Sequence, residues 1–396
     1  MASTRTRDAM LTVVGFAAWL LYILGCASFS PDDSKVLFPS NDPKTGGPVV
    51  AMYDRAAHTS RALLALPVPD PKNNSDAFYV RSLWTPDGSR VVSMWIEGDH
   101  ALRVMVLPLT PKEPARLLAV ADLGNDVPSP FLMPPPIVGS RLFISEKTQI
   151  RRVDLESGAE EKKAVDGEPL LVGVGNRIYY GRTLPDEGTR ENRVEFGLVD
   201  ANTLGLTPMF ETSESTQSDT PFFAVSRDGR RLGVLAGKEH ARQVLVFETS
   251  TPSAPPRRLS LGTEAGPIDA GEFQWSRDGS TVYCVFRKEV SDDQYQFGVL
   301  EVPVDGKAVR QIPFFRVSGS GENPDVFALQ VDVSHDGKTL AAASTYLQTP
   351  FGKKEAQRLK PEDLALYFVD LSRQDRRITK VPIPPLPAPP VTMARQ

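Results

Sequence analysis

Between Ser30 and Gly337 the polar and apolar positions repeat one order seven times: a tight polar turn, a basic or small residue, and a short apolar strand. The clear copies are SPDDSKVLF (30–38), TPDGSRVVSMW (85–95), SRDGRRLGVLA (226–236), SRDGSTVYCVF (276–286) and SHDGKTLAAAS (334–344), with degenerate copies VGSRLFIS (138–145) and VGNRIYYG (174–181). After each turn the third and fifth residues are mostly apolar, which is typical of a strand with one buried face. A unit that recurs at a near-fixed period predicts an array of β units packed against their neighbours.

The spacing of the repeats indicates the kind of array. The turn position is held by Asp33, Gly88, Gly139, Gly175, Gly229, Gly279 and Gly337, at intervals of 55, 51, 36, 54, 50 and 58 residues. A four-stranded propeller blade needs about 40–50 residues, so most intervals hold one blade and some inserted loop. The middle interval is tight. We predict an all-β chain: a seven-bladed β-propeller of four-stranded antiparallel blades over residues 26–381, preceded by a signal or anchor helix in 1–25 and followed by a proline-rich tail, 382–396.

Acidic residues recur at two points of each unit. One is the aspartate of the Asp-Gly turn, where the pair supplies the positive backbone torsion that a tight hairpin requires. The other ends a third strand, in AMYD (51–54), RRVDLESG (151–158), FGLVDANTLG (196–205), VLVFETS (244–250), GVLEVPVDG (298–306) and LYFVDLS (366–372). Because the turn aspartate repeats from blade to blade, we expect it to stabilise the hairpin rather than to catalyse a reaction.

The amino terminus carries an export signal. Residues 9–25 are uncharged and follow two arginines, and their length suits a signal peptide better than a membrane span, which needs about 20 residues. The segment ends in ILGC (23–26), which resembles the bacterial lipobox, in which a small residue precedes a cysteine that receives diacylglycerol before cleavage. Gly25 and Cys26 match this pattern, whereas a residue smaller than Leu24 is more usual. The resemblance implies lipidation of Cys26; the alternative is an uncleaved anchor or a plain signal peptide.

Each of these alternatives places the rest of the chain in the bacterial cell envelope, facing the periplasm or the exterior, with the membrane as its partner where an anchor is kept. The net charge of −4 and the pI near 5.8 argue against nucleic acid as a partner. The two cysteines, Cys26 and Cys284, build no disulfide framework. The 35 prolines suit an all-β chain with many loops, because proline is excluded from central strands and helix interiors.

A search for chemistry yields no catalytic, cofactor-binding or metal-binding residue. The string SGSG (318–321) lacks the spacing of a hydrolase nucleophile elbow. The four histidines, His58, His100, His240 and His335, fall in different predicted blades and form no metal-spaced pair. Residues 70–76 lack the glycine and the terminal glutamate of a calcium loop.

The S-P/R-D-G turn, with its basic residue and apolar strand, resembles the WD-like propeller repeat of TolB and of prolyl-oligopeptidase propellers. The resemblance covers nearly all of the chain after the signal, but it is a match of repeats. It implies the propeller fold and leaves the function open, because propellers carry unrelated activities.

Departures from the repeat suggest where function lies. In a propeller, the loops between second and third strands share one face with the loops between blades. We expect long loops there at 181–193, 287–296 and 346–363, and between blades at 67–78 and 122–136. The leading hypothesis is a non-enzymatic envelope scaffold that binds a protein or an envelope component through this face. The alternative is a propeller enzyme, lactonase- or dehydrogenase-like, with a site in the central channel.

Overall fold

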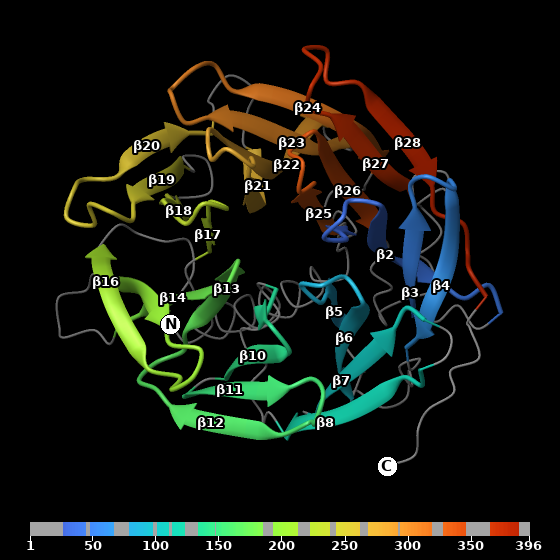
Figure 1. Ribbon diagram of the computed structural model, residues 1–396. Helices are drawn as coiled ribbons and strands as arrows, with labels where there is room; N and C mark the ends of the chain where they lie inside the picture. Colours follow the sequence, from blue (N-terminus) through green and yellow to red (C-terminus); the bar gives the residue numbers. More distant parts are fainter. Residues whose placement is uncertain are drawn as a thin grey trace, which may run out of the picture.

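The computed structural model describes residues 27–44, 48–66, 79–97, 101–110, 113–122, 134–146, 148–184, 193–212, 222–237, 243–261, 268–291, 294–318, 328–345 and 365–387. These residues form seven four-stranded antiparallel sheets arranged in a ring (Figure 1), and they contain no α-helix. The predicted seven-bladed β-propeller is therefore confirmed. The predicted helix in 1–25 and Cys26 lie outside the described residues.

Each blade uses four consecutive strands, the first innermost and the fourth outermost. Blades 1 to 3 contain β1 (Ser28–Phe29), β2 (Lys35–Asn41), β3 (Pro48–Asp54), β4 (Thr59–Ala65), β5 (Tyr79–Trp84), β6 (Arg90–Glu97), β7 (Ala101–Pro108), β8 (Arg116–Asp122), β9 (Ile137–Val138), β10 (Arg141–Glu146), β11 (Gln149–Asp154) and β12 (Glu160–Ala164). The short interval of 36 residues between Gly139 and Gly175 thus still leaves room for a complete third blade.

Blades 4 to 7 follow the same order around the ring (Figure 1). They contain β13 (Leu170–Val174), β14 (Arg177–Thr183), β15 (Val194–Val199), β16 (Leu206–Thr212), β17 (Phe223–Val225), β18 (Arg231–Ala236), β19 (Gln243–Glu248), β20 (Arg257–Ser260), β21 (Ile268–Trp275), β22 (Thr281–Ser291), β23 (Gln294–Pro303), β24 (Arg310–Ser318), β25 (Ala328–Val333), β26 (Thr339–Thr345), β27 (Ala365–Asp370) and β28 (Ile378–Pro382).

The core lies between neighbouring blades, because each sheet is covered on both faces. In β22, Val282 and Cys284 pack with the apolar residues of blade 5, whereas Tyr283 packs with those of blade 7. The second strands are therefore apolar at nearly every position. The apolar third and fifth residues after each turn are all buried, as predicted, and so is Ser93, the one polar residue at these positions, whose hydroxyl lies 2.7 Å from that of Ser82. Burying each large aliphatic side chain stabilises the ring by about 1.5–3 kcal/mol.

The prediction of a loop at 287–296 is wrong. Strands β22 and β23 continue through this region and pair as far as Ser291 and Gln294. β24 runs beside them to Ser318. Arg287 and Lys288 are only partly buried, so this end of the hairpin lacks the alternation of apolar and polar residues that identifies a packed strand. The polar sequence was therefore taken for a loop.

Candidate functional site

The strand order gives the ring two unlike faces. We call the side with the first-to-second and third-to-fourth connections the turn face, and the opposite side the loop face. Connections on the turn face span at most eight residues, at 249–256, whereas those on the loop face reach 19 residues, at 346–364. The predicted loops 346–363 and 67–78, and most of 181–193 and 122–136, lie outside the described residues. Their ends are nevertheless fixed by the strands that they join.

The turn face is built from one repeated hairpin. The seven turn positions have positive φ values between 59° and 73°, as the Asp-Gly pattern predicts. In the second blade, the Thr85 hydroxyl donates to Asp87 Oδ1 at 2.5 Å and accepts from the Arg90 backbone N–H at 3.1 Å. The Thr85 hydroxyl, helped by Ser89, lowers the pKa of Asp87 to about 2. The same Ser/Thr–Asp pairing recurs in blades 1, 5, 6 and 7, so the recurrent aspartate stabilises the hairpin.

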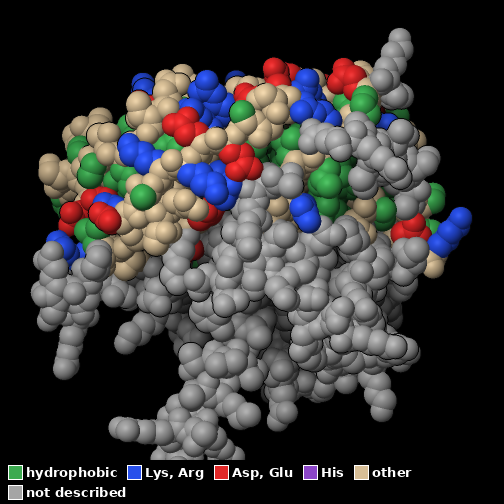
Figure 2. Space-filling view, turned by 90° about the horizontal axis from the view of Figure 1, so that it is seen from below, with side chains coloured by type: hydrophobic (Ala, Val, Ile, Leu, Met, Phe, Trp, Pro, Cys, Tyr) green, Lys and Arg blue, Asp and Glu red, His purple; other side chains and the backbone are tan. Residues whose placement is uncertain are grey.

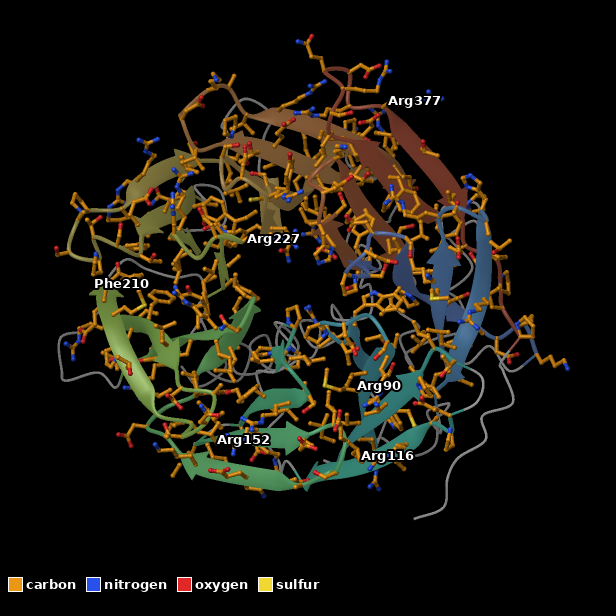
Figure 3. All side chains as sticks on the ribbon, viewed as in Figure 1. Arg90, Arg116, Arg152, Phe210, Arg227 and Arg377 are labelled. Carbon is orange, nitrogen blue, oxygen red and sulfur yellow. The ribbon has the colours of Figure 1, made fainter. Side chains whose placement is uncertain are left out.

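Successive turns pack against one another around the ring. A Cβ built at Gly337 would lie 2.8 Å from the Cβ of Arg277 in the preceding blade, and one at Gly279 would lie 3.4 Å from that of Ser226. Glycine is required at Gly337 for two reasons, the positive φ and this close approach. Arg227 lies on the inner side of the ring (Figure 3), and its guanidinium reaches from blade 5 to the His335 carbonyl of blade 7 at 2.9 Å.

Blade 1 departs from this pattern where it meets blade 7, because Asp33 replaces the turn glycine. Its carboxylate accepts hydrogen bonds from the backbone N–H groups of His335, at 2.6 Å, and Asp336, at 2.8 Å. Deeper in the same seam, Asp332 Oδ2 accepts from the Phe29 N–H at 2.8 Å. Burial raises the pKa of Asp332 to about 6. Two carboxylates thus join the first and last blades.

Arginines on the outer strands connect neighbouring blades. Arg257 begins β20 and donates to the Val304 carbonyl of blade 6 at 2.5 Å, and Arg310 begins β24 and donates to the Gln374 carbonyl of blade 7 at 2.5 Å. Arg116 and Arg152 lie on the outer part of the ring (Figure 3) and donate to carbonyls of blades 3 and 4. Lys and Arg are interspersed with Asp and Glu over the described part of the side that Figure 2 shows. Arg116, Arg152, Arg257 and Arg310 thus each connect two blades.

Two buried ionic clusters lie at the loop-face ends of the strands. In blade 3, Arg151 pairs with Glu146 and Glu160. In blade 4, Glu195 Oε1 accepts from the Tyr180 hydroxyl at 2.7 Å and from Arg182 Nε at 2.8 Å. Burial, reinforced by Glu195, raises the pKa of Tyr180. In each cluster the buried glutamate, Glu146 or Glu195, has an arginine partner, which is the arrangement that makes buried charge tolerable in a core.

The structure separates the residues that the sequence search considered. His335 Nδ1 lies 2.9 Å from Asp33 Oδ1, and His58 Nδ1 lies 2.9 Å from the Tyr53 hydroxyl. Cys284 is fully buried, and this burial raises its thiol pKa. His100, His240, residues 70–76 and the string 319–321 lie outside the described residues.

Within the described ranges, no group of three or more His, Cys, Asp or Glu side chains is placed to hold a metal ion. Over the same part of the chain, no helix is long and apolar enough to span a bilayer.

Sequence reasoning missed the seam between blades 1 and 7, although one signal of it was visible. SPDD (30–33) alone among the five clear copies has aspartate where the other four have glycine. Asp33 has a φ of +60°, a conformation that non-glycine residues seldom adopt, so its presence at this position implies a stabilising contact. The contact is with the pair of backbone N–H groups from blade 7.

No protein-family model and no curated protein matches the chain. Solved structures do match. The β-propeller domain of the Trilobed protease from Pyrococcus furiosus, which has an open velcro topology, aligns with a TM-score of 0.53 and 12% identity over 90% of this chain and 98% of that one. A chain from a study of two prolyl endopeptidases aligns with a TM-score of 0.53 and 13% identity over 93% of this chain, which spans about half (52%) of that one.

TolB from Acinetobacter baumannii aligns with a TM-score of 0.45 and 12% identity, over 73% of this chain and 65% of that one. At such identities the similarities concern the fold alone. The fold by itself assigns no activity, because propellers carry unrelated activities.

Proposed function

We propose that this chain is a membrane-anchored scaffold of the bacterial cell envelope that binds a protein or another envelope component through its loop face, without catalysing a reaction. The observation that carries the proposal is the asymmetry of the two faces. The turn face has short connections, whose aspartates make hydrogen bonds within the hairpins, while arginines at the start of adjoining strands make hydrogen bonds between blades. The loop face carries every long connection, and long loops on a rigid scaffold are where binding surfaces form.

The hydrophobic segment 9–25 and the lipobox-like ILGC (23–26) support the anchoring part of the proposal. Lipidation at Cys26 predicts that labelled palmitate enters the full chain and is lost in Cys26→Ala. Equal labelling of both proteins would contradict lipidation and leave the uncleaved anchor as the form of attachment.

The binding part is tested by deleting residues 348–360 from the connection between β26 and β27. Because loop length enters closure entropy only logarithmically, the deletion should change the melting temperature little. It should abolish or weaken the capture of a partner identified with the full chain in detergent extracts of envelopes. The matched control is Lys338→Ala, an exposed residue of the turn face. Capture that survives the deletion but is lost in the folded control would contradict the proposal.

A further inference from the structure

The turn of blade 7 holds a carboxylate with two consecutive backbone N–H groups. Asp33 Oδ1 accepts from the His335 N–H at 2.6 Å, and Asp33 Oδ2 accepts from the Asp336 N–H at 2.8 Å. Successive N–H groups in a turn form a concave anion-binding site. The guanidinium of Arg55 completes the arrangement, because it donates to the Asp33 carbonyl at 2.7 Å. The seam between blades 7 and 1 thus shows how a turn of this repeat binds an oxyanion.

The turn of blade 5 presents the same two groups without an acceptor. The Ser226 hydroxyl donates to Asp228 Oδ1 at 2.7 Å, and the equivalent serine and aspartate of blade 7 pair in the same way. Because the two turns are alike, the N–H groups of Arg227 and Asp228 correspond to those that bind Asp33. Among the residues that the structure describes, nothing accepts a hydrogen bond from either of these N–H groups.

Gly279 explains the missing acceptor, because it occupies in blade 6 the position that Asp33 occupies in blade 1. Their φ values are 66° and 60°, so the backbone conformation is alike and the carboxylate alone is missing. A Cβ at 279 would lie 3.4 Å from Ser226 Cβ, an ordinary contact, so there is room for a carboxylate beside the blade 5 turn. Arg231 Nη1 donates to the Gly279 carbonyl at 2.5 Å, as Arg55 donates to that of Asp33.

The other clear copies of the turn lack one of these requirements. In blades 1 and 2 the first donor is absent, because Pro31 and Pro86 have no N–H. In blade 6 the room is absent, because a Cβ at Gly337 of the next blade would lie 2.8 Å from Arg277 Cβ. In blade 7 the place is taken by Asp33. Among the five clear copies, the turn of blade 5 is therefore the one that offers both donors and room.

The charges around this turn favour an anion. It carries Arg227, Arg230 and Arg231, against Asp228 and, at the end of β19, Glu248. Arg227 and Arg230 are exposed, and Arg227 lies on the inner side of the ring (Figure 3). The aspartate does not exclude an anion, because the blade 7 turn has an aspartate at the same position and still binds a carboxylate.

We propose that the seam between the turns of blades 5 and 6 is a binding site for the carboxylate of a ligand, held by the N–H groups of Arg227 and Asp228 as blade 7 holds Asp33. The inference goes beyond the proposed function, because the site lies on the turn face and needs neither the anchor nor the loop face. A carboxylate is the matching group because it is what the equivalent turn of blade 7 binds. Its source is a small organic acid or an acidic peptide segment, and the test separates the two.

The test is a titration of the full chain in detergent micelles, labelled with deuterium and ¹⁵N and followed by amide chemical shifts. Sodium acetate replaces sodium chloride at constant pH and ionic strength. The amides of Arg227 and Asp228 should shift saturably, whereas those of Arg277 and Asp278, where Gly337 leaves no room, are the internal control. Because a hydrogen bond to a charged group changes affinity about tenfold or more, we expect half-saturation at an acetate concentration lower by about that factor than for the control pair. An equal response of the two pairs, or none, would overturn the proposal.

Two variants at position 279 check that the carboxylate occupies the predicted place. Gly279→Asp supplies the acceptor from within the chain, and Gly279→Ala is the matched control that adds a Cβ at the same φ without an acceptor. In Gly279→Asp, the amide protons of Arg227 and Asp228 should move downfield before acetate is added, and the titration should be lost. Gly279→Ala should titrate like the parent. A folded Gly279→Asp that still titrates like the parent would overturn the proposal, and the parent titration decides the question where a variant does not fold.

Two further ligands identify the source of the carboxylate. An oligo-aspartate peptide that shifts the Arg227 and Asp228 amides at a lower carboxylate concentration than acetate would assign the site to an acidic protein segment. Shifts at an equal carboxylate concentration would assign it to a small acid. Inorganic phosphate that acts at a lower concentration than both would contradict the carboxylate as the ligand group.

Discussion

Asp33 and His335, 302 positions apart, connect the two ends of the ring. Asp33 Oδ1 lies 2.6 Å from the backbone nitrogen of His335 and 2.9 Å from its Nδ1. Among the described strands, blades 1 and 7 exchange none, since β1 to β4 and β25 to β28 form separate sheets. The ring is therefore closed by side-chain contacts rather than by a shared sheet. These contacts should matter more for stability than equivalent ones elsewhere in the propeller.

Asp33→Gly tests the role of this carboxylate. Glycine tolerates the φ of +60°, so the backbone is not strained, but two N–H groups of blade 7, one partly buried and one exposed, lose a charged acceptor. A hydrogen bond to a charged group contributes about 1.5–3 kcal/mol, and we expect a loss of about 2–3 kcal/mol in the free energy of unfolding, measured with urea. Asp33→Asn keeps one acceptor oxygen and should lose less. Unchanged stability in Asp33→Gly would show that the seam does not depend on this residue.

Asp332 should give the seam a dependence on pH. Its folded pKa of about 6 lies above the ordinary value of 3.8, so between these values the folded chain binds more protons than the unfolded chain. Stability contributed by this group is present below about pH 4 and is lost as the pH rises through 6. Asp332→Asn stays neutral and keeps an oxygen for the Phe29 N–H but gives up the acceptor for the Val333 N–H, so its gain at pH 7 should stay below about 3 kcal/mol. Urea unfolding at pH 4.5 and 7.5 checks this; a variant less stable than the parent at pH 7.5 would contradict it.

Gly337 and Gly139 separate backbone strain from the close approach of blades. Both have positive φ, of 73° and 61°, but a Cβ at 139 meets nothing within 4 Å, whereas one at 337 meets Arg277 Cβ at 2.8 Å. Gly139→Ala should cost only the conformational strain, about 1–2 kcal/mol. Gly337→Ala should cost about 2–4 kcal/mol, because the blades must also move apart. Equal shifts of the urea midpoint in the two variants would show that the turns of neighbouring blades are not tightly packed.

Features that depend on a short stretch of sequence were predicted correctly, whereas contacts between residues far apart in the sequence were not. The blades were predictable because a turn such as TPDG (85–88) and the strand that follows it are local patterns with a fixed period. Contacts between blades were not, because Arg257 donates to a carbonyl 47 residues away and Asp33 contacts a residue near the other end of the chain. The hairpin at 287–296 was missed because partly buried strands lose the apolar alternation that identifies a strand. The loop face was predicted from loop length alone, and its chemistry depends on residues brought together from several blades.

The carboxyl-terminal segment after β28 supplies the last closing contact. Ile383 and Leu386, within the tail predicted at 382–396, are each 8% exposed and pack with Phe29 and Val36 of blade 1 and with Leu366 of blade 7. The Ser40 hydroxyl of β2 donates to the Pro384 carbonyl at 2.9 Å. This short segment thus crosses from the last blade to the first, where a shared strand would otherwise close the ring.

Two truncations distinguish a closing segment from a passive tail. Ending the chain after Pro382 removes both buried side chains, each of which contributes about 1.5–3 kcal/mol of burial, and exposes the core between blades 7 and 1. We expect a loss of about 3–5 kcal/mol in unfolding free energy, with hydrogen exchange accelerated first in β1, β2 and β26, while the amides of blades 3 to 5 keep their relative protection. The control ends after Pro387 and retains both side chains, so it should match the full chain. If the two truncated chains unfold at the same urea concentration and exchange alike, the segment does not close the ring, and the seam must be held by Asp33, Asp332 and the packing of β1 alone.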